Sequence, residues 1–120
     1  MMCRKNMRSI QAVLRELGLS GRSVALRQLV CAVELAHEEQ TLLTRVYKGL
    51  YRRVAEEFGE TNTTAVERNL RGIRDRVWER GNMERLQEMA MVPIKLKPST
   101  GELIDIIRYH MEINGLFPEG

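Results

Sequence analysis

The stretch TTAVERNLRGIRDRVWERG, residues 63–81, decides most of what this sequence predicts. Its apolar residues recur at helical spacing and form one stripe suited to a buried face: Val66, Leu70, Ile73 and Val77. The opposite face begins with small side chains and arginines: Thr64, Ala65, Arg68, Arg71 and Gly72. Arginines bind guanine edges and phosphates, and small residues allow a close approach to base pairs. The stretch therefore predicts a helix over about 64–80 that can lie in the major groove of DNA.

The start of this helix also has a sequence signal. Thr64 and Glu67 have the spacing of a capping box, so we expect the helix to begin there. A helix that starts sharply, buries one face and offers arginines on its first outward turns is typical of a recognition helix. The alternative is a solvated surface helix, in which Asp75 and Glu79 simply balance neighbouring arginines.

The preceding segment, VYKGLYRRVAEEFGETN at 46–62, favours the recognition helix. Its apolar residues predict a helix over about 47–58. Ala55 followed by Gly59 has the spacing of a helix-turn-helix, where a small residue permits close helix crossing and glycine permits a positive φ. Val66 then locks the second helix onto the first. It lies eleven positions after Ala55 instead of the usual ten, so we expect a turn one residue longer.

The size and charge of the chain fit one helical domain. A chain of 120 residues with 43% apolar content can bury a single core. No apolar run approaches the roughly 18 residues that span a bilayer, and the N-terminus lacks the apolar run of a secretory signal. We therefore expect a soluble, cytoplasmic protein with no membrane partner. The net charge is only +3, but residues 64–80 hold five arginines against three acids.

Chemistry-bearing motifs are absent from the sequence. It contains no glycine-rich phosphate loop, no GxSxG motif and no cluster of histidines, cysteines or carboxylates. His37, His110, Cys3 and Cys31 are isolated and lack the spacing of metal ligands. We expect neither an enzyme nor a protein with a metal or cofactor.

The remaining sequence also predicts helices. They are expected at about 9–17, 22–38 and 83–89, with a short helical connector at 39–46. A last helix is opened by a capping box of Ser99 and Glu102 and closed by Gly115. The prediction is an all-α domain of about six helices at 9–115, with its helix-turn-helix at about 47–80, between tails at 1–8 and 116–120.

Two segments leave alternatives open. Alternation in Ile94–Lys97 places Lys95 and Lys97 on one side of an extended segment, which suits either a phosphate-clamping wing or a plain surface connection. The last helix has more apolar residues than one stripe needs: Leu103, Ile104, Ile106, Ile107, Met111 and Ile113. They fit either a contact with a partner chain or burial within the domain.

Four pieces of the chain together resemble a known family. They are IQAVLRELGL at 10–19, VYKGLYRRVAEEF at 46–58, NTTAVERNLRGIRDRVWERGN at 62–82 and IKLKPSTGELI at 94–104. The chain is similar to the C-terminal DNA-binding effector domain of the sporulation initiation (stage-zero) response regulators of endospore-forming bacteria, from Ser9 to about Met111. This resemblance implies a six-helix fold that binds TGNCGAA-type promoter boxes on double-stranded DNA as head-to-tail pairs, with RNA polymerase as a further partner.

The resemblance also implies residue roles. Glu67 and Arg68 match an adjacent Glu-Arg pair that reads bases, so Glu67 is expected to accept from cytosine and Arg68 to donate to guanine. Arg71 matches an arginine expected at a phosphate or the groove edge. The expected DNA-binding set is Thr63, Thr64, Ala65, Glu67, Arg68, Arg71, Lys95 and Lys97. Ala65 stands where the family places another DNA-contacting arginine.

Three functions follow as hypotheses. The first is a sequence-specific transcription regulator without its own receiver domain, either a stand-alone paralogue or an excised effector domain. The second is a helical interaction module or anti-activator that pairs with a full-length regulator through the last helix. The third is a non-specific nucleoid binder.

Overall fold

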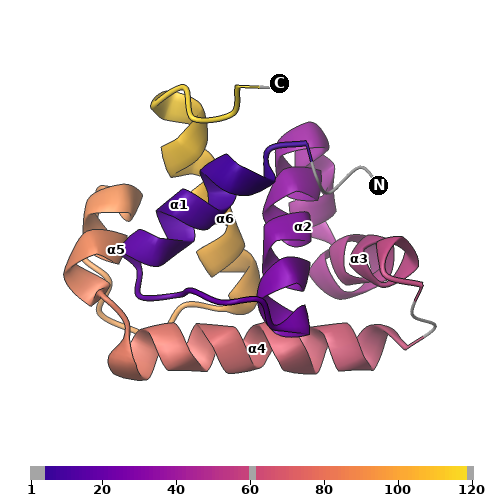
Figure 1. Cartoon of the computed structure of the whole chain (residues 1–120). Coiled ribbons are helices and arrows are strands. Elements are labelled where there is room, and N and C mark those ends of the chain that lie inside the picture. The colour runs from indigo at the N-terminus through magenta and orange to yellow at the C-terminus, as the bar shows by residue number, and fades with distance from the viewer. Residues whose placement is uncertain (1–4, 60–61, 119–120) are drawn as a thin grey trace.

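A computed structural model describes residues 5–59 and 62–118 (Figure 1). The described residues form six α-helices and no strand, which confirms the predicted all-α class. The elements are α1 (Met7–Glu16), α2 (Val24–Glu38), a 3-10 helix η2 (Gln40–Thr44), a π-helix η3 (Val46–Tyr51), α3 (Arg52–Glu57), α4 (Thr63–Arg80), α5 (Met83–Ala90) and α6 (Thr100–Ile113).

α4 runs along one edge of the molecule, and the other helices lie to one side of it (Figure 1). α2 is the central helix, packing against α1, α4 and α6. This position explains why almost every residue of α2 from Leu26 to Ala36 is buried. α4 by contrast buries only the predicted stripe, so the side of the helix that faces away from the body is available to solvent.

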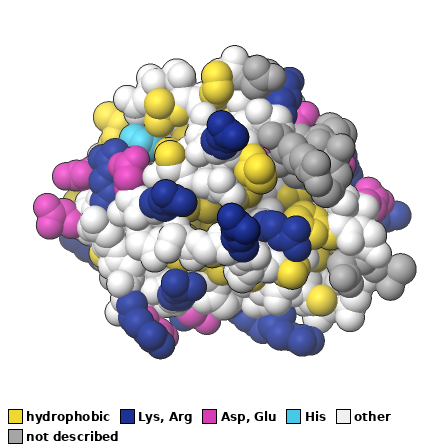
Figure 2. Space-filling view, viewed as in Figure 1, with side chains coloured by type: hydrophobic (Ala, Val, Ile, Leu, Met, Phe, Trp, Pro, Cys, Tyr) yellow, Lys and Arg dark blue, Asp and Glu magenta, His cyan; other side chains and the backbone are white. Residues whose placement is uncertain are grey.

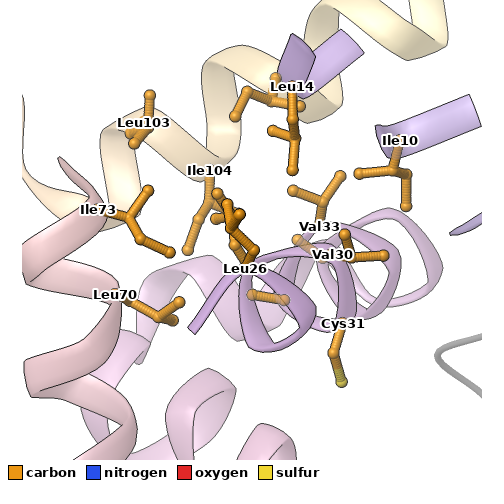
Figure 3. Packing of buried hydrophobic residues seen from close by; sticks show 14 of the residues in the cluster. Ile10, Leu14, Leu26, Val30, Cys31, Val33, Leu70, Ile73, Leu103 and Ile104 are labelled. Atoms are coloured by element: carbon orange, nitrogen blue, oxygen red, sulfur yellow. The ribbon is translucent and has the colours of Figure 1, made fainter. Parts of the chain in front are cut away.

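The core is built from the apolar stripes of four helices (Figure 3). α1 and α2 meet through residues that include Ile10, Leu14 and Val33, while Leu70 and Ile73 bring α4 onto the same cluster. α6 contributes Leu103 and Ile104, which are at most 1% exposed. Because α4 shares this core, its orientation is fixed by packing and not by the loops at its ends.

Several helix ends follow the predicted signals. Gly18 has φ +87° after α1, and Leu19 N donates to Leu14 O at 2.9 Å. Ser99 and Glu102 form the predicted capping box at α6. α2 differs slightly: Ser23 is its N-cap, accepting from Leu26 N at 3.1 Å, so the helix begins at Val24 and not at Arg22.

The first part of the helix-turn-helix departs from a single α-helix. Its apolar spacing predicted one helix over 47–58, but the structure has the π-turn η3 followed by the short α3. Arg45 O accepts from both Gly49 N (2.7 Å) and Leu50 N (3.1 Å), which widens this turn. The motif residues still behave as predicted: Ala55 and Val66 are buried and Gly59 has φ +67°. Residues 60 and 61 of the longer turn lie outside the described residues.

The packed domain extends beyond the limits of 9 and 115 that we predicted. Asn6 is buried, and its Nδ2 donates to Glu34 Oε2 at 2.9 Å. At the other end, the ring of Phe117 stacks on His37 with centroids 3.7 Å apart and is 8% exposed. These residues were assigned to tails because each lies outside the helical periodicity. In the described part of the chain, no helix is long and apolar enough to cross a membrane.

Candidate nucleic-acid interface

The outward face of α4 carries the residues that the sequence assigned to DNA. Thr64, Arg68 and Arg71 are exposed, whereas Val66 and Leu70 on the opposite side are at most 1% exposed. Ala65, Thr63 and Glu67 are half-buried at the edges of this face. Gly72 adds open space, since a Cβ built on it would meet no atom within 4 Å. The first turns therefore present a shallow surface with two exposed arginine side chains.

The start of α4 corrects the predicted capping box. Asn62 is the N-cap, with extended backbone angles, and its side chain accepts from Thr64 N at 2.9 Å. Thr64 is therefore inside the first turn and cannot serve as the cap. The carboxylate of Glu67 bonds to Arg71 and does not cap the helix. The helix starts at Thr63, one residue earlier than predicted, because Asn62 is itself a strong capping residue.

Tyr47 is a site residue that sequence reasoning missed. Its hydroxyl lies 2.6 Å from Thr64 Oγ1, and the side chain is 46% exposed. This contact places a phenol at the start of α4, where a donor can reach a DNA phosphate. In the sequence Tyr47 resembles one more apolar residue of the first helix. Only the position of η3 beside α4 reveals its role.

Glu67 holds an unsatisfied acceptor on this surface. Its Oε1 accepts from Arg71 Nη1 at 2.9 Å. Its Oε2 is buried and has no hydrogen-bond partner in the described structure. Burial first, and then the charge of Glu67, raise the pKa of the nearby Tyr51 above its ordinary value. An unsatisfied carboxylate oxygen can accept from an external amino group.

Arg68 is the free donor of the same surface. Its side chain is exposed and makes no ion pair or hydrogen bond with any residue that the structure describes. Arg71, three residues later, is held by Glu67 through an i,i+4 pair. The guanidinium of Arg68 is therefore available for a bidentate contact, since no internal bond has to be broken.

The segment between α5 and α6 is tied to the second half of α4. Asp75 Oδ1 pairs with Lys97 Nζ at 2.5 Å and with Arg74 Nε at 2.8 Å. Hydrogen bonds from Lys97 and Arg74 lower the pKa of Asp75 below its ordinary value. Arg74 Nη1 also donates to Pro98 O at 3.0 Å. These bonds hold the segment beside the recognition helix in one position.

The predicted alternation of this segment is only partly correct. Lys95 and Lys97 are both exposed, and Ile94 packs against the core. Leu96, however, is 83% exposed and does not alternate inward. Lys97 is paired with Asp75, seven residues or about 10 Å along the axis from Arg68. The structure thus groups the α4 positions at one end of the helix and places Lys97 beside its second half.

Charge over the face seen in Figure 2 is mostly basic. Lys and Arg side chains spread across its middle and lower parts, while Asp and Glu gather toward its margins. The apolar surplus of α6 is largely internal: Leu103, Ile104, Ile107 and Met111 are buried, Ile106 is half-buried and Ile113 is 51% exposed. Among the described residues no group of three His, Cys, Asp or Glu side chains could hold a metal ion.

Comparison with known families agrees with this geometry. A family model described as "Sporulation initiation factor Spo0A C terminal" matches residues 10–111. The match covers nearly the whole chain and includes α4 and the elements packed on it. The chain belongs to this family of effector domains of sporulation response regulators.

Proposed function

We propose that this member of the Spo0A C-terminal family is a sequence-specific, double-stranded DNA-binding transcription regulator that places α4 in the major groove. One observation carries the proposal most directly. On the first outward turns of α4, the unpaired donor Arg68 adjoins the unsatisfied acceptor Glu67 Oε2. Adjacent donor and acceptor groups of this kind suit neighbouring base pairs, whose edges present both.

Each of the two residues has a distinct role in this proposal. Arg68 donates to guanine O6 and N7 through its planar guanidinium. Glu67 accepts from a cytosine amino group with the oxygen that lacks a partner in the described structure. The Glu67–Arg71 pair does not prevent this, because an i,i+4 pair on a helix surface contributes only about 0.3–0.5 kcal/mol. Arg71 is then free to turn to a phosphate.

The remaining site residues position the duplex. Thr63, Thr64 and Tyr47 supply hydroxyl groups near the start of α4, where they can bond to phosphates. Lys95 contributes charge from the segment beside α4, and Lys97 does so after exchanging Asp75 for a phosphate. Ala65 offers no base contact, so the site preference differs from that of family members with an arginine there. The difference is worth roughly 1–3 kcal/mol for a bidentate pair.

The family likeness suggests the wider setting. We expect TGNCGAA-like promoter boxes bound by head-to-tail pairs of the domain, with RNA polymerase as a further partner. The test of base reading is Arg68→Ala. We expect its affinity for a box duplex to fall roughly tenfold to a hundredfold, by the 1–3 kcal/mol of one bidentate contact. Its affinity for a scrambled duplex should fall far less.

A control variant separates base reading from loss of charge. Arg52→Ala removes an exposed arginine from α3, where its ion pair is with Glu56 at 3.7 Å. We expect this variant to change binding to the two duplexes alike. Equal losses on both duplexes for Arg68→Ala would rule out its role as a base reader.

A second candidate is a helical interaction module or anti-activator that pairs with a full-length regulator. Its support is the exposure of Tyr109 (45%) and Ile113 (51%), which lie one turn apart on α6. Capture of a receiver-bearing homologue, combined with no retardation of any duplex, would favour this candidate.

A further inference from the structure

A cavity of about 240 Å³ lies between α1 and α2, beside the loop that joins them. Its floor is apolar, with Leu14, Leu19 and Val30 among its residues. Its rim is polar and basic, formed by Arg15, Arg22, Arg27, Gln11 and Ser20. All three arginines are exposed. The combination is a concave site surrounded by cationic side chains.

The charges of this rim are not balanced within the molecule. The side chains of Arg15 and Arg22 make no hydrogen bond or ion pair to any part of the chain that the structure describes. Arg27 lies over the ring of Phe58, 5.8 Å from its centroid. By contrast, Arg85 holds two carboxylates. Three uncompensated cations around one cavity repel one another, and an anion placed between them removes that repulsion.

The same loop carries a second basic cavity at the end of α4. Residues 17–19 line a cavity of about 210 Å³ together with Arg76, Arg80 and Gly81. The loop is fixed there, because Asn82 N donates to Leu17 O at 3.2 Å. A Cβ at Gly81 would lie 3.0 Å from Leu17 O and 2.7 Å from Val77 O. The rim arginines therefore hold a constant position relative to the recognition helix.

The length of α4 sets what these arginines can reach. At about 1.5 Å per residue, Arg80 lies about 18 Å along the axis from Arg68, and the major groove is only about 12 Å wide. When Arg68 is at a base edge, the far end of α4 lies over a phosphate strand. The five arginines around the α1–α2 loop then continue beyond that strand: Arg15, Arg22, Arg27, Arg76 and Arg80.

We propose that this arginine surface binds backbone phosphates of the duplex outside the box that α4 reads. Guanidinium groups bind phosphate through paired N–H donors, and such contacts carry no sequence information. The surface extends the footprint of one domain and raises its affinity for long duplexes regardless of sequence. This inference rests on the proposed function, because α4 must first place the DNA.

The test is a salt titration of DNA binding by the double variant Arg15→Ala/Arg22→Ala. Both side chains are exposed and outside the core, so folding should be retained, which circular dichroism and thermal unfolding check. The control, Lys5→Ala/Arg8→Ala, removes two exposed cations at the opposite end of α1. Two duplexes are used, a box with minimal flanks and the same box extended by about one helical turn on each side.

On the extended duplex only, we expect the slope of log K against log salt to fall by about 0.9 for each phosphate that the variant no longer binds. The preference for the box over scrambled sequence should stay as in the parent protein. The control should keep the parent slope on both duplexes. An unchanged slope for the double variant would overturn the inference, and a retained effect of Arg68→Ala would leave the proposed function standing.

Two other outcomes also decide the matter. If the parent protein bound no duplex, the inference would fail together with the proposed function. If inorganic phosphate at millimolar concentration raised the Tm of the parent but not of the double variant, while the DNA slopes stayed equal, the site would take a free anion. That result would contradict the assignment to the DNA backbone.

Discussion

At the scale of single residues, the structure separates capping from reading. Spacing in the sequence assigned Thr64 and Glu67 a capping role that Asn62 performs instead. This error arose because three capping residues stand in a row, and spacing alone does not say which one has extended backbone angles. Arg68 was predicted on the exposed face and is found there. Tyr47 could not be predicted, because its contact with Thr64 joins two elements.

The corrected cap gives a prediction for stability. Asn62→Ala removes the side chain that accepts from Thr64 N, and we expect it to lower the free energy of unfolding by about 1 kcal/mol. Thr64→Ala removes only an exposed hydrogen bond to Tyr47 and should cost less. Urea unfolding of both variants measures the difference. A larger effect of Thr64→Ala would restore Thr64 as the cap.

At the scale of elements, the sequence predicted the helix-turn-helix well because its signals are local. The apolar stripe of α4, the small residue Ala55 and the turn glycine Gly59 are all recognised from spacing within one segment. The π-turn η3 was missed, since apolar residues four positions apart fit either conformation. The outward Leu96 was missed because the segment at 91–99 is positioned by Arg74 and Asp75.

The two glycines of this motif should respond oppositely to alanine. Gly59 has φ +67°, so Gly59→Ala should destabilise the fold by about 1–2 kcal/mol. Gly72 lies inside α4 with open space around it, so Gly72→Ala should stabilise the fold by about 0.5–1 kcal/mol. Thermal unfolding compares them directly. Destabilisation by Gly72→Ala would show that this position is not open.

At the scale of the whole molecule, contacts between distant segments close the fold, and the sequence could not show these contacts. His37 on α2 contacts both Phe117 and Glu112, the second of which is 75 residues away. Burial tends to raise the pKa of Glu112, but hydrogen bonds from Arg108 and His37 bring it below its ordinary value of 4.5. The folded state therefore favours the ionised carboxylate.

This shift predicts how stability depends on pH. The stabilisation from Glu112 is present above the ordinary carboxyl pKa of 4.5 and is lost as pH falls through the lower pKa of the folded state. Glu112→Gln should remove part of this acid dependence. Urea unfolding between neutral and acidic pH measures it. A variant with the same pH profile as the parent would exclude Glu112 as a source of the dependence.

All of the binding predictions depend on the domain distinguishing one DNA sequence from another. Fluorescence anisotropy at physiological salt measures this property, with one duplex carrying two TGTCGAA boxes and one scrambled duplex. We expect a preference of tenfold or more for the boxes, about 1.4 kcal/mol. Equal affinity for the two duplexes, or no binding to either, would show that α4 does not read these boxes.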